Sequence, residues 1–212
     1  MGESLNRRQF LEMIGHVLDR LESSAEELNR LDAAVGDGDL GVTMTLGCRA
    51  VRNVLPGLSE QDLGTIVAKC GMAFNGAAPS TMGALLAIGA MRAGKEGRGA
   101  QELDVALLAR MARAAETGIK EKGQAERGDK TLLDALGPSA DSLESAARDG
   151  VPLAVAVRAA TAAARAGVEA TIPMKAKSGR AAWITERTAG QPDPGATVVR
   201  IIWEAFEEYL TK

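Results

Sequence analysis

The chain has 212 residues, of which 46% are hydrophobic and 3% aromatic, and its formal net charge is −3. An acidic chain with few aromatic rings lacks the basic face and the stacking surface of nucleic-acid binders, and no apolar run approaches the roughly 18 residues that a membrane span needs. We therefore expect a soluble cytoplasmic protein of one domain, residues 1–212, which binds neither nucleic acid nor membrane.

The N-terminal segment carries charge where a signal peptide needs an apolar stretch, and Asn6 stands where a myristoylation signal has Ser or Thr. The two cysteines, Cys48 and Cys70, lie in apolar helical context without metal-binding spacing. This usage favours free thiols in a reducing compartment. We expect no export, no lipid anchor and no disulfide.

Hydrophobic periodicity and Gly or Pro breaks predict a succession of helices. The expected helices cover about Phe10 to Leu28, Thr43 to Val54, a segment behind Ser59, a segment behind Ser80 or Thr81, Leu103 to Ile119, Lys130 to Ala147, Pro152 to Ala170, and Ala196 to Leu210. A further short helix is expected within residues 180–188. No stretch is typical of paired strands, so the expected fold is an all-α, antiparallel up-and-down bundle or barrel.

Four residues are predicted to mark helix ends. Ser59 is the candidate cap of the third helix, with Asp62 in its first turn. Gly94 is predicted to end the fourth helix, and Asp129 is predicted to cap the helix from Lys130 to Ala147.

The segment "LDAAVGDGDLG" places Asp32, Asp37 and Asp39 on a glycine-rich loop. Three close carboxylates repel one another unless a cation lies among them, and hard oxygen ligands suit Mg²⁺, especially beside phosphate oxygens. The alternative is a solvated loop whose aspartates form turns and cap the helix that begins near Thr43. A calcium-binding EF-hand is disfavoured because the closing glutamate is absent.

The segment "GAAPSTMG", residues 76–83, is a turn of small residues at a predicted helix start. Exposed N–H groups and the helix dipole make such turns suited to phosphate, or the turn could lie along a ribose or base. Close packing between helices explains the same small residues equally well.

Two later segments offer further candidate contacts. In "KGQAERGDKTLLDALGP", Gly123 allows close ligand approach and Leu132 offers an apolar face to a flat ring, although helix capping explains the same segment. In "SGRAAWITERTAGQPDPGA", Arg180 could bond phosphate, and the turn from Asp193 to Gly195 precedes the last helix. A solvated arginine and an ordinary helix start are the alternatives.

The only histidine, His16, falls within the first helix and away from these segments. No Ser/His/Asp triad and no Cys/His pair can be assembled at the loops. Any chemistry there should act through positioning and electrostatics around a metal, as phosphoryl transfer does.

Taken together and in this order, the four segments resemble the L subunit of dihydroxyacetone kinase over nearly the whole chain. The resemblance implies an eight-helix antiparallel barrel that holds ADP or ATP through two Mg²⁺ ions in loops at one end. It implies that Asp32, Asp37 and Asp39 are the metal-binding and catalytic carboxylates, with Arg180 beside them.

The resemblance also implies the nucleotide contacts. Gly41 and Thr43 approach the phosphates, Ala77 and Ala78 the nucleotide, and Gly123 and Leu132 the adenine, while Arg180 and the turn at Asp193 complete the enclosure. The implied contacts in full are Leu40, Gly41, Val42, Thr43, Ala77, Ala78, Gly123, Leu132, Arg180, Asp193, Pro194 and Gly195.

In the family, a separate K subunit or domain binds the ketone through a histidine and receives the phosphoryl group. The donor is either exchanging ATP or a phosphohistidine protein of the sugar phosphotransferase system, which rephosphorylates a retained ADP. We expect this chain to have no room for the K domain. An Ala-rich helix face packs equally well within or between chains, so monomer and homodimer both remain open.

The chain departs from the family pattern at several polar positions. Leu40 stands where relatives commonly have histidine, Thr43 where they often have asparagine, Ala78 where serine is typical, and Gln191 with Pro192 where a histidine and a polar residue occur. Each change removes a polar contact, and none removes a metal carboxylate. We expect metal and nucleotide to bind still. Two alternatives are a related kinase with another acceptor, such as erythrulose or a lipid carboxylate, and a nucleotide-loaded regulatory or scaffold protein without turnover.

Overall fold

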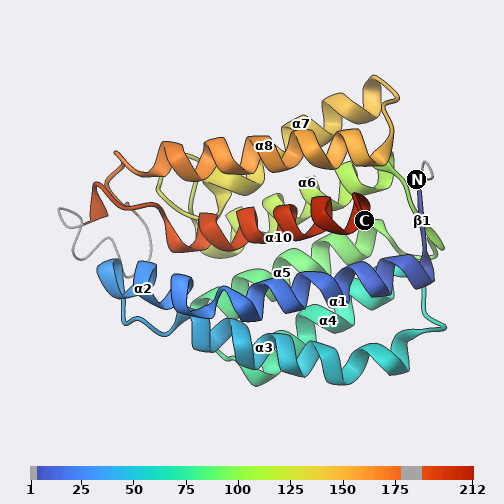
Figure 1. Ribbon diagram of the computed structural model, residues 1–212, viewed down its shortest axis with the longest axis horizontal. Helices are drawn as coiled ribbons and strands as arrows, with labels where there is room; N and C mark the ends of the chain where they lie inside the picture. The colour runs from blue at the N-terminus through green and yellow to red at the C-terminus, as the bar shows by residue number, and fades with distance from the viewer. Residues whose placement is uncertain (1–3, 178–187) are drawn as a thin grey trace.

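The computed structural model describes residues 4–177 and 188–212, and most of these residues lie in α-helices that run back and forth along one long axis (Figure 1). The described helices are α1 (Arg7–Ser23), α2 (Ala25–Val35), α3 (Leu40–Val54), the 3₁₀ turn η1 (Leu55–Leu58), α4 (Leu63–Ala77), α5 (Thr81–Glu96), α6 (Val105–Gly123), α7 (Leu133–Arg148), α8 (Leu153–Thr171) and α10 (Pro194–Leu210). The predicted all-α architecture is confirmed.

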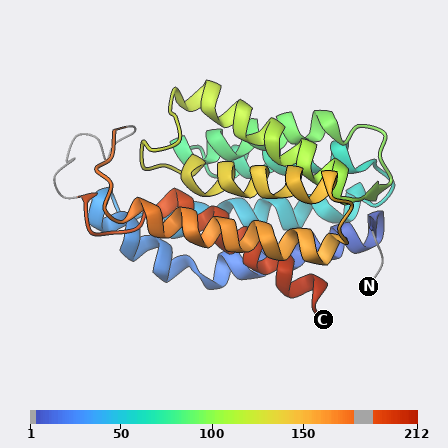
Figure 2. The same ribbon diagram turned by 90° about the horizontal axis from the view of Figure 1, so that it is seen from above.

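The helices close into a ring. From α3 to α8 each helix packs against the next one in sequence, α10 packs against both α8 and α1, and α3 packs against α1, α2 and α4. The view from above shows the same antiparallel arrangement (Figure 2). Because short connections join antiparallel neighbours, every second helix begins at the same end of the ring.

Buried side chains inside the ring form two hydrophobic clusters. The larger one includes Leu63, Leu133 and Trp203, and the smaller one includes Leu28, Met44 and Ile201 between the first helices and α10. Burial of these apolar stripes stabilises the ring, since each CH₂ removed from water contributes about 0.8 kcal/mol.

Several predicted helix ends differ from the structure. Asp62 is the N-cap of α4, where it accepts a hydrogen bond from the Thr65 N–H, and it does not lie in the first turn. Ser59 instead follows η1. Helix α5 continues past Gly94 to Glu96. Gly94 does not end the helix but allows it to pack closely against α4 at Gly64.

Asp129 does not cap α7, contrary to the prediction. Its carboxylate accepts a hydrogen bond from the Glu126 N–H within the preceding loop, and Leu132 occupies the N-cap position without a side-chain bond. Helix α7 therefore begins three residues later than expected.

The first predicted helix is divided at Ser24 into α1 and α2. A two-residue antiparallel pair, β1 (Leu5–Asn6) with β2 (Glu102–Leu103), joins the start of α1 to the segment before α6. His16 lies on α1 beside Glu208 of α10, 3.2 Å from its Oε2, which is a contact between helices.

The predicted short helix in residues 180–188 falls almost wholly outside the described residues. Within residues 4–177 and 188–212, no helix combines the length and the apolar character that a bilayer crossing requires.

Candidate functional site

Four of the helices in the described part of the chain begin around one end of the ring. The first turns of α3, α5, α7 and α10 all contribute residues to a single cavity there. A helix N-terminus carries roughly half a positive charge, from N–H groups that lack helical partners. The alternation of the ring therefore brings four anion-favouring helix ends to one place.

The aspartate loop between α2 and α3 forms one side of this cavity. Carboxylate oxygens of Asp32, Asp37 and Asp39 all lie within 4.8 Å of one another. Asp32 Oδ2 accepts hydrogen bonds from the Gly38 N–H at 2.9 Å and the Asp39 N–H at 3.0 Å. Gly38 has a positive φ of 78°, a conformation that glycine adopts without steric cost, and this turn folds the loop back toward Asp32.

The geometry supports parts of both interpretations of these aspartates. Asp39 occupies the N-cap position of α3, yet its side chain makes no capping hydrogen bond. Asp32 does form a turn through its two backbone contacts, so the loop supplies both a turn and a converging carboxylate set. Three carboxylates at this spacing fit a hard divalent cation such as Mg²⁺, which takes oxygen ligands.

The cavity has a volume of about 340 Å³, within the range of small-molecule sites. It is lined by Asp32, Val35, Gly36, Asp37, Asp39, Leu40, Thr43, Pro79, Ser80, Thr81, Met82, Leu85, Ile119, Gly123, Ala125, Lys130, Thr131, Leu132, Leu133, Asp193, Pro194 and Gly195.

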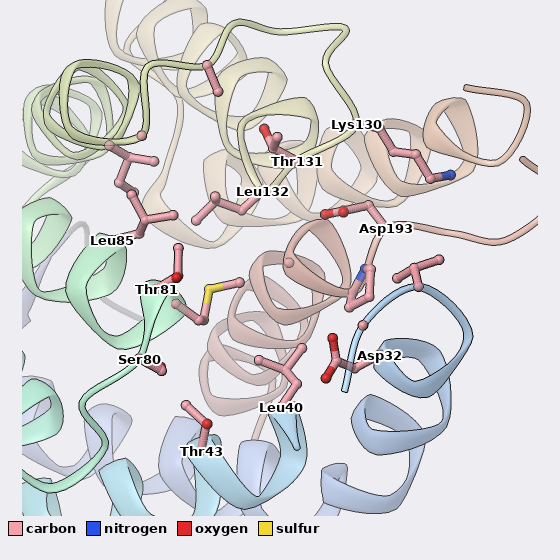
Figure 3. Close-up of a pocket in the computed structure, with 18 of the residues that line it drawn as sticks. Asp32, Leu40, Thr43, Ser80, Thr81, Leu85, Lys130, Thr131, Leu132 and Asp193 are labelled. Carbon is pink, nitrogen blue, oxygen red and sulfur yellow. The ribbon is translucent and has the colours of Figure 1, made fainter. Parts of the chain in front are cut away.

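The lining changes from charged to apolar across the cavity. Leu85 and Leu132 lie across from Asp32, while the hydroxyls of Ser80, Thr81 and Thr43 lie along the wall (Figure 3). Ile119 adds to the apolar side. With a divalent cation on the three carboxylates, such a cavity accommodates a ligand with an anionic end and a flat apolar end.

A buried lysine joins three segments beside the cavity. Lys130 is 3% exposed, and its ammonium donates to the carbonyls of Thr171 and Gln191, each at 2.5 Å. Burial lowers the pKa of Lys130, while the nearby carboxylates of Asp193 and Asp134 oppose that shift. Lys130 thereby fixes the loop before α7 to the end of α8 and to the segment before α10.

Asp193 begins α10 and accepts a hydrogen bond from the Ala196 N–H at 2.6 Å. Burial raises its pKa to about 7, with a further contribution from Asp134, against the opposing effects of the Ala196 N–H and of Lys130. The next residues, Pro194 and Gly195, complete this wall, where Gly195 packs against Met82 and Leu132.

The structure brings together most of the residues singled out from sequence. The predicted residues that line the cavity are Asp32, Asp37, Asp39, Leu40, Thr43, Gly123, Leu132, Asp193, Pro194 and Gly195. Arg180 lies outside the described residues.

Four predicted nucleotide contacts are absent from the described cavity lining. Gly41 instead faces α2, donating its N–H to Asn29 Oδ1 at 2.7 Å, and a side chain there would collide with the Ala25 carbonyl. Val42 is 51% exposed on the outer face of α3. Ala77 is exposed at the end of α4, and Ala78 is buried in the smaller hydrophobic cluster.

Sequence reasoning missed several lining residues, chiefly Met82, Leu85, Ile119, Ala125, Lys130 and Thr131. The apolar ones resemble ordinary core positions, since their periodicity is the same whether they face the core or a cavity. Lys130 does carry a usable signal, because it lies in the Gly-Asp-Lys-Thr segment, for which helix capping is the alternative explanation.

Comparisons with known proteins agree on one relationship. The family model of the DAK2 domain matches residues 34–208. The chain is 32% identical to the PEP-dependent dihydroxyacetone kinase, ADP-binding subunit DhaL, of Escherichia coli (strain K12), over 95% of this chain and 96% of that protein. It is 37% identical to the D-erythrulose kinase of Mycolicibacterium smegmatis, over 91% of this chain and 34% of that protein.

Among solved structures, the dihydroxyacetone kinase from C. freundii in complex with AMP-PNP and Mg²⁺ matches with a TM-score of 0.71 at 28% identity, over 93% of this chain and 33% of that chain. The chain therefore spans nearly the whole length of the Escherichia coli subunit, but about a third of the other two proteins.

Proposed function

The chain belongs to the DAK2 domain family, and from that premise we propose that it is the nucleotide-binding phosphotransferase subunit of a dihydroxyacetone kinase. The observation that carries the proposal is the convergence of Asp32, Asp37 and Asp39 on a cavity whose far wall is apolar. The similarity to an ADP-binding subunit and to a kinase complexed with AMP-PNP and Mg²⁺ supports it.

The three carboxylates hold Mg²⁺, two ions in our proposal, at the charged side of the cavity. The metal, when bound, neutralises phosphate charge as it develops in the transition state. The N-termini of α3 and α5 add N–H groups and a positive dipole end toward the phosphates. Thr43 and Ser80 lie where their hydroxyls can donate to phosphate oxygens.

The apolar side receives the adenine ring. Leu85, Ile119 and Leu132 supply flat contact surface, and Gly123 leaves room for close approach. Asp193 and Gly195 close the wall beside the ring. Arg180, outside the described residues, remains a proposed phosphate contact on the strength of the sequence resemblance.

The described cavity contains no histidine, and His16, the only one in the chain, lies on α1 beside α10. Our proposal therefore places the ketone on a separate K-type subunit that docks against the cavity mouth, and the γ-phosphoryl group crosses between the two proteins. The donor is either ATP or a phosphohistidine protein of the phosphotransferase system, and the cytoplasm is the proposed compartment.

Replacing one metal-binding carboxylate tests the proposal. In Asp37→Asn, the affinity for Mg-ADP should fall at least tenfold, corresponding to about 1.4 kcal/mol, because the cations lose a counter-charge while the helices stay intact. Isothermal titration measures the affinity and circular dichroism the helix content.

Asp149→Asn is the matched control, because Asp149 is an exposed carboxylate at the end of α7 remote from the cavity. Its Mg-ADP affinity should equal that of the wild type. Unchanged affinity in Asp37→Asn would reject the metal assignment. Purification without added nucleotide, with and without a chelator, would show whether ADP is retained through the metal.

A second candidate acceptor is erythrulose, which the 37% identity to the D-erythrulose kinase favours. The nucleotide end of the reaction is the same for both acceptors. Phosphorylation assays with a panel of ketones, each with and without candidate K-type subunits, separate them. Turnover in the absence of any partner would contradict the division of labour proposed above.

A further inference from the structure

The loop of residues 124–132, between α6 and α7, forms part of the apolar wall of the cavity. Ala125, Thr131 and Leu132 line the cavity from this loop. Its backbone is unusual, because Gln124 and Lys130 have positive φ values of 49° and 61°. Left-handed conformations of residues other than glycine persist only where the surroundings enforce them.

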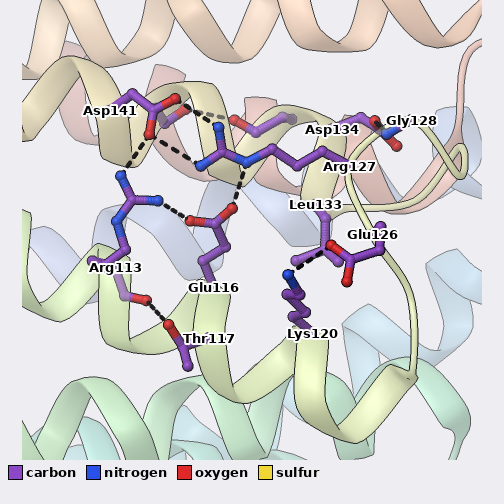
Figure 4. A network of polar contacts seen from close by, with 12 residues as sticks. Arg113, Glu116, Thr117, Lys120, Glu126, Arg127, Gly128, Leu133, Asp134 and Asp141 are labelled. Carbon is purple, nitrogen blue, oxygen red and sulfur yellow. Dashed lines mark hydrogen bonds and ion pairs between the residues drawn. The ribbon is translucent and has the colours of Figure 1, made fainter.

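Arg127 is an anchor of this loop. Its guanidinium donates to Glu116 Oε1 at 2.6 Å, to Asp141 Oδ2 at 2.6 Å and to Asp141 Oδ1 at 3.0 Å (Figure 4). Glu116 lies on α6 and Asp141 on α7, so one loop side chain bridges both helices that flank the loop. The planar guanidinium suits this two-sided geometry better than an ammonium would.

The partners of Arg127 are themselves fixed. Glu116 is 6% exposed and also pairs with Arg113, which in turn bonds Asp141 and Glu144. Hydrogen bonds from Arg127 lower the pKa of Asp141 to about 2, with burial acting against the shift, so this carboxylate stays ionised at neutral pH. The buried Glu116 carboxylate on α6 and the ionised Asp141 carboxylate on α7 thus give Arg127 one anchoring partner on each helix.

Asp134 continues the attachment inside the loop. Its carboxylate accepts hydrogen bonds from the Gly128 N–H at 2.5 Å and the Thr131 N–H at 2.7 Å. The backbone between Arg127 and Leu132 is therefore held at both of its ends. Among the described residues, Arg127 is not part of the cavity lining, so any effect on a ligand passes through this backbone.

The fold leaves space for the Arg127 guanidinium on α7. A Cβ built at Gly137 would overlap the guanidinium of Arg127 and crowd Glu116 Oε1. Glycine in a helix interior costs about 1 kcal/mol relative to alanine. Arg127 and its two partners, Glu116 and Asp141, form a cluster that we call the clamp. Gly137 is the position at which the Arg127 guanidinium of this clamp packs against α7.

We propose that Arg127 is a positioning residue for the nucleotide, whose clamp with Glu116 and Asp141 holds residues 124–132 in the shape that receives the adenine ring. The inference rests on the proposed nucleotide-binding function and adds a residue that does not touch the ligand. Without the clamp, ligand binding must itself order the loop, which costs binding free energy. The contribution of the adenine ring to the affinity therefore falls, while the contribution of the metal and the phosphates is unchanged.

The test compares the binding of two ligands to the wild type and to four variants. Titration calorimetry measures the affinity for Mg-ADP and, by competition with it, for Mg-pyrophosphate, which lacks the nucleoside. Arg127→Gln should weaken Mg-ADP about tenfold or more and change Mg-pyrophosphate less than about twofold. Arg127→Lys, which keeps the charge but not the fork, should give an intermediate loss for Mg-ADP.

Arg113→Gln is the matched control. It removes a guanidinium from the same charge network, but Arg113 lies on α6 and is not part of the loop. Its affinity for both ligands should stay within twofold of the wild type, even if its melting temperature falls. Gly137→Ala supplies an independent variant, since it displaces the Arg127 guanidinium without removing a charge and should reproduce the selective loss. If Arg127→Gln fails to fold, Gly137→Ala carries the test.

Hydrogen exchange gives a readout without ligand. Amides of residues 125–132 should exchange faster in Arg127→Gln than in Arg113→Gln, while those of the aspartate loop do not change. Equal affinities in folded Arg127→Gln and wild type, an equal loss for both ligands, or the same loss in Arg113→Gln would overturn the inference. A wild type that binds no Mg-ADP would instead overturn the proposed function, and the inference with it.

Discussion

At the residue scale, Asp193 combines a structural and an electrostatic role. It caps α10 while its carboxyl lies beside Lys130 and Asp134 next to the cavity. Burial raises its pKa to about 7, so the folded protein takes up a proton that the unfolded chain, with an ordinary carboxyl pKa, has released. Because the folded state binds more protons than the unfolded state between pH 4 and pH 7, the free energy of unfolding falls as the pH rises from about 4 to about 7.

The pH dependence predicts the effect of Asp193→Asn. Asparagine caps a helix as well as aspartate does but cannot ionise, so the variant should gain stability over the wild type as the pH rises from 5 to 8. The gain is at most about 1.4 kcal/mol per pH unit between the two pKa values. Urea unfolding at both pH values measures it.

Asp62→Asn is the control, because the pKa of Asp62 is shifted in the opposite direction from that of Asp193. Hydrogen bonds from Thr65 outweigh the effect of burial and lower the pKa of Asp62, so its contribution is complete above the ordinary carboxyl range and is lost only in acid. The stability deficit of this variant should be the same at pH 5 and pH 8. A constant difference between Asp193→Asn and wild type over that range would contradict the raised pKa of Asp193 in the folded protein.

At the scale of elements, α4 and α5 pack closely through glycine. A Cβ at Gly64 would collide with the Gly94 carbonyl and the backbone of Gly97 and Arg98, whereas a Cβ at Gly76 in the same helix meets nothing within 4 Å. Backbone cannot move aside as a flexible side chain does. Among the three glycines of α4, Gly64 is thus required by close packing, whereas Gly76 is not.

Two alanine substitutions in α4 test this contrast. Gly64→Ala should lower the free energy of unfolding by about 1–3 kcal/mol, because the helices must separate. Gly76→Ala should leave it unchanged or raise it by up to about 1 kcal/mol through helix propensity. Chemical unfolding monitored by circular dichroism compares them, and equal effects would argue against tight packing at Gly64.

The features that could be predicted from sequence are those with a local pattern. Helix existence followed from apolar periodicity, and the aspartate loop from its composition, because both are local patterns. The predicted cap of α7 was wrong because the Asp129 carboxylate accepts a hydrogen bond from the Glu126 N–H in the preceding loop instead. The positions of Leu85 and Ile119 in the cavity wall were missed because core and cavity positions have the same periodicity.

Long-range contacts account for the remaining differences. Gly41 was expected to approach phosphate, but the helix α2 that packs on it comes from an earlier part of the chain. The burial of Lys130 depends on carbonyls at Thr171 and Gln191, which lie more than forty residues away in sequence. Neither contact has a signature in the neighbouring residues.

At the scale of the whole molecule, the cavity joins corners of the ring that are distant in sequence. Its walls come from the α2–α3 loop, the start of α5, the α6–α7 loop and the start of α10. A ligand there would contact residues of both hydrophobic clusters, such as Leu132 of the larger one and Leu40 of the smaller one. Binding should therefore stabilise the entire fold against unfolding.

We expect Mg-ADP at one hundred times its dissociation constant to add about 2.7 kcal/mol to the stability of the fold. For a protein of this size, that corresponds to a rise of about 5–10 °C in Tm. ADP with a chelator should give little or no rise, because the aspartates then repel the phosphates. Differential scanning calorimetry measures the shift, and equal shifts with and without Mg²⁺ would contradict the metal-dependent site.

The ring also determines where the chain can be attached to a surface. Strand β1 and the end of α10 both lie at the end of the molecule away from the aspartate loop (Figure 1). A biotin or fluorescent label placed at either of these ends stands clear of the cavity mouth. The protein can thus be immobilised on a biosensor chip through such a tag with its mouth facing the solution, which makes it suitable bait for direct kinetic measurements with a docking subunit.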